Sequence, residues 1–175
     1  MPPFSGAATA RLVPGVGTWI LSAPASACFS VGNLVVGAVH GSVPVRSAYA
    51  EIAEDGSVRD AGGVLDLGGI DTGHPRRDKH LRRPSLLDLD THPDLTFAAT
   101  SVRPGPAGWS VSGTLTARGV TRPIEVDAAA QEEPDGTVAL RLSGRLDRGD
   151  YGVSAPRFLI GSVVELSVDM VLARR

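Results

Sequence analysis

The sequence has one cysteine and one lysine, few aromatic residues and no long hydrophobic run. The single cysteine, Cys28, excludes a disulfide within the chain and any metal site built from cysteines alone. It is compatible with a reducing compartment such as the cytosol. No run approaches the roughly 20 apolar residues that a membrane-spanning helix needs. The N-terminal segment lacks an early positive charge and an unbroken apolar stretch, so we expect no signal peptide and a cytoplasmic location.

The residues that are present describe an ordinary globular domain. The chain of 175 residues is 42% hydrophobic and carries a formal net charge of −2, which argues against disorder and against a strongly basic nucleic-acid-binding protein. A chain of this length buries a substantial core in a single domain without disulfides. Its 21 glycines and 13 prolines, with 5% aromatic residues, are typical of many short strands joined by turns.

Apolar and polar residues alternate with a period of two, as in half-buried strands. The alternation is clearest in 108–117, 122–130, 138–147 and 164–173. Strand composition, bounded by turn signals, also occurs in 17–23, 28–36, 39–53, 63–71 and 94–102. Eight or nine strands joined by short turns pair antiparallel, and they form a sandwich or a closed barrel. Either way we expect an all-β protein with one domain.

The longest break in the strand pattern is the segment 72–93, where three prolines prevent a continuous strand. Five basic residues fall within eight positions of this segment: Arg76, Arg77, Lys79, Arg82 and Arg83. Three of the four histidines lie in or beside it: His74, His80 and His92. We expect a short helical or irregular connector around residues 72–93.

Other classes of function find less support in this segment. A serine hydrolase needs a nucleophile, a base and an orienting acid, but the chain has no Gly-x-Ser-x-Gly elbow. A metal site could use His74, Asp78, His80 and His92, yet no metal-ligand spacing is present. The run RRDKHLRR could contact nucleic-acid phosphates, but nearby acidic residues and scarce aromatics oppose this. We therefore expect no enzyme activity, no metal, no cofactor and no nucleic-acid partner.

Four stretches occur in an order that is specific enough to compare with a known family: TGHPRRDKHLRRPSLLDLDTHPDLTF, GWSVSGTLTARGVTRPIEVD, LDRGDYGVS and IGSVVELSV. Together they resemble the YceI family, from about Gly17 to Ala173. The most specific pieces are the cluster around Arg77 and Asp78, Pro93 followed by Phe97, and GTLTARGVTRP. The resemblance implies a single antiparallel eight-stranded lipocalin-like β-barrel over 17–175, after an N-terminal extension over 1–16. It also implies a polyisoprenoid ligand and a homodimer.

A polyisoprenoid tail is hydrocarbon, so its binding site must be an apolar barrel interior with polarity confined to the mouth. Burying ten CH₂ equivalents contributes about 8 kcal/mol before ordering costs, so the tail dominates affinity. The inward candidates for tail binding are Trp19, Phe29, Val31, Phe97, Trp109, Val111, Leu115, Leu140 and Leu166. Small neighbours such as Ala99 and Gly113 would leave space.

The basic segment is a candidate for the head group of the lipid or for a lid over the mouth. Its residues with this role would be Arg76, Arg77, Asp78 and His80, because guanidinium groups bind phosphate in a bidentate manner. If the ligand were an isoprenoid quinone, His80 or an arginine could donate to its carbonyl. In the alternative interpretation these residues only pin a turn, and the apolar side chains fill a solid core. The chain would then be a stress-response or protein-interaction module without a lipid ligand.

Overall fold

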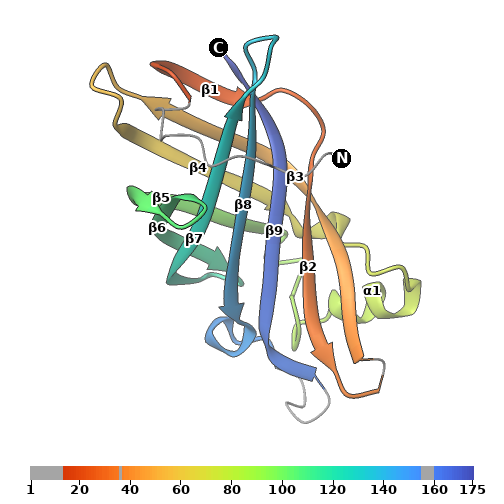
Figure 1. Ribbon diagram of the computed structural model, residues 1–175. Helices are drawn as coiled ribbons and strands as arrows, with labels where there is room; N and C mark the ends of the chain where they lie inside the picture. The colour runs from red at the N-terminus through yellow and green to blue at the C-terminus, as the bar shows by residue number, and fades with distance from the viewer. Residues whose placement is uncertain (1–13, 36, 155–159) are drawn as a thin grey trace.

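The computed structural model describes residues 14–35, 37–154 and 160–175. Its strands close into one antiparallel barrel (Figure 1). The strands are β1 Gly17–Leu21, β2 Ser26–Asn33, β3 Gly37–Ile52, β4 Val58–Asp66, β5 Asp94–Gly105, β6 Gly108–Ala117, β7 Val120–Glu132, β8 Val138–Asp147 and β9 Ile160–Arg174. The connections contain the 3₁₀ helices η1 Leu67–Gly69 and η2 Arg148–Tyr151, and the α-helix α1 Pro75–Leu81. The predicted all-β barrel and its short helical connector are confirmed.

The nine strands fill eight positions around the ring, because β1 and β2 share one position between β3 and β9. β2 pairs with one half of β3, and β1 pairs with the other half. Both also pair with β9. Pro24 lies in the segment 22–25 between them, and a proline has no backbone N–H to donate to a neighbouring strand. The predicted extension over 1–16 falls mostly on residues outside the described part of the chain.

The position of β4 differs from the prediction, which was a strand over 63–71. β4 begins at Val58 and ends at Asp66, and its middle contains Gly62 and Gly63, two adjacent glycines of a kind that is often a turn signal in a sequence. These glycines are required by close packing of the backbone. A Cβ atom on Gly62 would lie 2.7 Å from the carbonyl oxygen of Phe97, and one on Gly63 would lie 2.9 Å from that of Ser47. A glycine in a strand thus marks the close approach of neighbouring strands.

The connections alternate between the two ends of the barrel. The hairpin end carries the turns β3–β4, β5–β6 and β7–β8, and the helix end carries η1, α1 and η2 (Figure 1). The turn between β6 and β7 also lies at the helix end. Among the described residues, no helix is long and apolar enough to cross a membrane.

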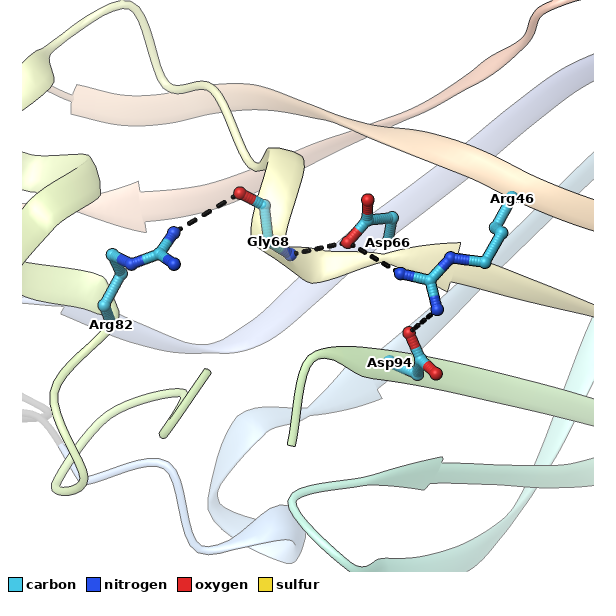
Figure 2. A network of polar contacts seen from close by, with 5 residues as sticks. All are labelled: Arg46, Asp66, Gly68, Arg82 and Asp94. Atoms are coloured by element: carbon cyan, nitrogen blue, oxygen red, sulfur yellow. Dashed lines mark hydrogen bonds and ion pairs between the residues drawn. The ribbon is translucent and has the colours of Figure 1, made fainter. Parts of the chain in front are cut away.

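A polar network fastens the connector at the helix end (Figure 2). Asp66 and Asp94 lie directly opposite each other on β4 and β5. Arg46 of β3 forms ion pairs with both carboxylates, at 3.1 Å from Asp66 and in a short contact with Asp94. Asp66 also accepts a hydrogen bond from the Gly68 backbone N–H at 3.0 Å, and Arg82 donates to the Gly68 carbonyl at 3.4 Å. The network therefore joins three strands to η1 and to the residue that follows α1.

Arg118 ties together three connections at the same end. It lies in the turn between β6 and β7 with a φ of 52°, a left-handed conformation that is uncommon outside glycine. Its guanidinium group donates to the carbonyl of Pro84 at 2.7 Å and to that of Gly152. These contacts hold the β4–β5 connector and the segment after η2 against the β6–β7 turn. The ARG of the GTLTARGVTRP motif therefore has a structural role at the helix end.

Candidate functional site

The barrel encloses a cavity of about 490 Å³, within the range of about 300–1,000 Å³ that is usual for ligand pockets. Its lining is almost entirely apolar and comes from every strand from β3 to β9. Because side chains alternate along a strand, the inward rows of these strands converge on one interior. The interior stays open because many inward positions hold small residues, including Ala48, Ala61, Ala128 and Ala130.

The cavity is closed at the helix end by a cluster of buried apolar side chains. Its members are Val43, Leu67, Leu89, Leu95, Leu115 and Tyr151. Leu67 comes from η1, Leu89 from the connector and Tyr151 from η2. Burial raises the pKa of the Tyr151 hydroxyl, so it stays neutral within this cluster. The elements that interrupt the strand pattern thus supply the floor of the barrel.

The cavity reaches solvent at the hairpin end. Its lining extends to Pro14 and to the turn Asp55–Ser57 between β3 and β4, where Asp55 and Ser57 are exposed. The pairing of β4 with β5 stops at Gly62 and Ala98, although both strands continue toward the hairpin end. Trp109 and Val102 line the cavity from the neighbouring β5–β6 hairpin. The entrance therefore lies at this end, where β4 and β5 are no longer joined.

The β3–β4 turn places a carboxylate at the entrance. Asp55 accepts hydrogen bonds from the Ser57 hydroxyl at 2.6 Å and from the Ser57 backbone N–H at 2.9 Å. The hydrogen bond from the Ser57 hydroxyl has the largest effect and the one from the backbone N–H the next largest, and both lower the pKa of Asp55 below its ordinary value. This side chain is therefore ionised at neutral pH. Asp135 makes the same contacts with Thr137 in the β7–β8 turn, but Asp135 does not line the cavity.

The structure places six of the nine predicted tail-binding residues in the lining of the cavity. They are Phe97, Trp109, Val111, Leu115, Leu140 and Leu166. The other three lie outside the lining. Trp19 is 3% exposed and packs behind the lining, in a core cluster whose other buried members line the cavity, and its indole N–H donates to the Gly15 carbonyl at 2.8 Å. Phe29 packs against the cluster that closes the helix end, and Val31 is a half-buried residue of β2.

Several lining residues were not among the predicted tail-binding set. They include Val45, Ile124, Val126, Ala128, Val138, Val168, Met170 and Leu172. Four of them (Val138, Val168, Met170 and Leu172) share the alternating face of β8 or β9 with a residue that was predicted, and Ile124, Val126 and Ala128 form the alternating row of β7, so the period-two pattern carried the signal for these seven. Asp55 and Ser57 carried no such signal, because a turn residue has no assigned face in a pattern of alternation. Their place at the entrance depends on the closure of the barrel.

The basic segment does not line the cavity, so the structure separates the predicted head-group residues from the predicted tail residues. Asp78 accepts hydrogen bonds from the backbone N–H of Thr72, at 3.0 Å, and from its hydroxyl. Arg77 donates to the Thr72 hydroxyl at 2.8 Å and to its carbonyl at 2.9 Å. Thr72 is 8% exposed, and the adjacent Asp71 exchanges backbone hydrogen bonds with Ser42 of β3. Arg77 and Asp78 therefore hold the start of the connector against the barrel wall.

The remaining residues of the segment lie on the surface or serve the connector. Arg76 and His80 are exposed on α1. His74 is the N-cap of α1, and His92 lies beside Gly119 in the β6–β7 turn. Within the described residues no three His, Cys, Asp or Glu side chains are grouped as ligands for a metal ion. The candidate site of this chain is thus the cavity, and the basic segment is outside it.

A closed antiparallel barrel around an apolar cavity defines a lipocalin-like protein. The floor formed by the connector and the entrance at the opposite end describe the geometry of a binding pocket. A family model described as the YceI-like domain matches residues 19–172. The chain belongs to the YceI family.

Relatives in sequence include proteins that are named only by a family number. A UPF0312 protein of Pectobacterium carotovorum subsp. carotovorum is 39% identical over 110 residues, which are 60% of this chain and 57% of that protein. A UPF0312 protein of Yersinia pestis is 42% identical over 65 residues, which are 37% of this chain and 34% of that protein. The chain thus spans less than two thirds of the length of these relatives.

Solved structures share the fold. BcnA of Burkholderia cenocepacia has a TM-score of 0.73 at 15% identity, covering 84% of this chain and 95% of that chain. A polyisoprenoid binding domain from Saccharophagus degradans has a TM-score of 0.67 at 16% identity, covering 92% of this chain and 100% of that chain. The YceI protein of Campylobacter jejuni has a TM-score of 0.63 at 22% identity, covering 73% and 80%. At these identities the likeness concerns the fold alone.

Proposed function

We propose that this chain binds the tail of a polyisoprenoid lipid, a polyprenyl phosphate or an isoprenoid quinone, in the barrel cavity and carries it without chemical turnover. The observation that carries the proposal is the cavity of about 490 Å³ with its apolar lining. A branched hydrocarbon gains free energy only by leaving water, and this lining offers that environment over the length of the barrel. Membership of the YceI family and the fold shared with a polyisoprenoid binding domain support the same ligand class.

The test compares two substitutions on one strand. Ala128 of β7 lines the cavity, whereas the adjacent Ala129 is outside the lining. Ala128→Phe would fill part of the cavity, and displacing two CH₂ groups of a tail removes about 1.6 kcal/mol, or about tenfold in affinity. Ala129→Phe adds the same ring outside the lining. We expect native mass spectrometry of gently purified protein to detect a prenyl lipid in the wild type and Ala129→Phe, with much lower occupancy in Ala128→Phe.

A barrel that binds partners only at its surface is the competing function. In that case the wild type would arrive empty, would fail to take up added prenyl lipids, and would match Ala128→Phe in every lipid assay. Circular dichroism of both variants would establish that the barrel is folded. The expected homodimer and cytoplasmic location stay predictions, which light scattering and cell fractionation would check.

A further inference from the structure

The lining of the cavity has a marked charge asymmetry. Asp55 is the one charged side chain among the described lining residues, and no arginine, lysine or histidine is among them. The polar lining groups nearest the entrance are Asp55 and Ser57 of the β3–β4 turn. A head group that remains at the entrance while its tail fills the barrel therefore meets a carboxylate and a hydroxyl.

The surroundings of the entrance are also acidic. Glu54 neighbours Asp55 in its turn, and the β7–β8 turn at the same end carries Glu133 and Asp135. Arginines toward this end have partners of their own: Arg59 pairs with Glu51 at 3.3 Å, Arg103 pairs with Glu125 at 3.0 Å, and Arg174 lies over the ring of Trp19 at 5.2 Å from its centroid. The charge of Arg59 also contributes, as the smallest cause, to the lowered pKa of Asp55, so it offsets a small part of the negative charge of this turn.

The cationic residues of the connector are remote from the entrance. α1 and the arginines around it lie at the helix end, and the floor cluster separates that end from the cavity. Arg77 of this group is already bonded to Thr72. A phosphate at the entrance would thus lose part of its hydration, meet no cation among the lining residues that the structure describes and face an ionised carboxylate, and each of these effects opposes binding.

We infer that the cavity selects polyisoprenoids with an uncharged head group, such as a prenol or a quinone, over those that carry a phosphate. The inference rests on the proposed function, since it specifies the ligand of the same cavity. A prenol hydroxyl can donate a hydrogen bond to the Asp55 carboxylate, and a neutral head group loses little hydration on reaching the entrance. Asp55 is then the residue that determines head-group specificity.

The test uses two ligands with the same tail. Geranylgeraniol and geranylgeranyl phosphate would each be titrated against the full chain carrying the neutral dye Nile red, and displacement of the dye would be followed by fluorescence. We expect the alcohol to bind about tenfold more tightly than the phosphate, the factor that two like charges a few ångströms apart produce at a partly hydrated site. The difference should shrink as salt is added, because ions screen this repulsion.

Asp55→Asn removes the charge and keeps an oxygen that accepts from Ser57. We expect this variant to bind the phosphate more tightly and so to lose most of the preference. Asp135→Asn is the matched control, because Asp135 has the same turn contacts but is outside the lining. Its preference should stay much closer to that of the wild type than that of Asp55→Asn does, because Asp135 contributes only to the acidic surroundings of the entrance.

Each possible negative result contradicts a different claim. A wild type that binds the phosphate as tightly as the alcohol, or more tightly, would overturn the selection and leave the proposed lipid binding intact. An unchanged preference in Asp55→Asn would overturn the role of Asp55. If neither lipid displaced the dye, the proposed function itself would fail.

Discussion

Small residues on the inward faces of the strands determine how much free space the barrel contains. Gly113 was expected to leave space for a tail, but a Cβ atom there would lie 2.7 Å from the ring of Phe97. Gly41 has the same relation to Phe29, whose ring would lie 2.4 Å from an added Cβ atom. These glycines make room for an aromatic ring of the neighbouring strand. The free space comes instead from alanines such as Ala128 and Ala130.

Trp109 and Arg77 provide a test of which end of the barrel binds the lipid. Trp109 lines the cavity, so Trp109→Ala should weaken tail binding by about 10-fold to 100-fold, as expected when a large apolar contact is lost. Arg77→Ala should leave tail affinity within about twofold and lower the stability of the barrel by about 1–3 kcal/mol, because the bonds to buried Thr72 are lost. Lipid titration and thermal denaturation measure the two effects. The opposite ranking of the variants in the titration would place the tail near α1.

The alternation of residues predicted the inward face of each strand but not the height of a residue within the barrel. Trp109 and Leu140 line the cavity from the strand ends near the hairpins, whereas Phe97 lines it while also packing against the cluster at the helix end. Phe29 and Val31 share the inward pattern, yet β2 carries them to the helix end, beyond the cavity. That height depends on the stagger between neighbouring strands, which a single sequence does not specify.

At the scale of elements, the seam between β4 and β5 has two different halves. Near the helix end it is paired from Gly62 to Asp66 and is fastened by Arg46. Toward the hairpin end the pairing stops and the cavity reaches solvent. The boundaries of β4 were the least predictable part of the fold. Two adjacent glycines, Gly62 and Gly63, are often a turn signal, and the 3₁₀ helix η1 follows the strand directly. The connector was easier to predict, because its prolines exclude a strand.

Arg46 should matter because it separates two like charges. Asp66 and Asp94 are direct cross-strand partners, an arrangement that destabilises a sheet when no cation intervenes. Arg46→Met should lower the free energy of unfolding by about 1 kcal/mol, in keeping with the partial exposure of all three side chains. Asp94→Asn in the same background should recover part of this loss. Denaturant titrations at low and high salt measure the effect, and strictly additive effects of the two substitutions would show that the charges do not interact.

At the scale of the whole molecule, ligand binding and stability are linked. A lipid that binds only the closed barrel at 100 times its Kd stabilises it by about 2.7 kcal/mol. For a chain of this size that corresponds to an increase in Tm of roughly 5–10 °C. We therefore expect extraction of the lipid to lower the Tm and reloading with a prenyl lipid to restore it. Ala128→Phe, with about tenfold weaker binding, should show only about half of this shift at the same lipid concentration, and an equal shift in that variant would indicate lipid bound outside the cavity.

The sharing of one barrel position by β1 and β2 has a consequence for synthesis of the protein. β1 and β2 both pair with β9, so the first strands of the chain are completed by the last. On the ribosome, β3 to β8 can form hairpins as they emerge, but the ring stays open until β9 is released. Trp19 lies against Arg174, the last residue of β9. Its fluorescence would therefore report the final event of folding, and a chain truncated before β9 would expose two unsatisfied strand edges to aggregation.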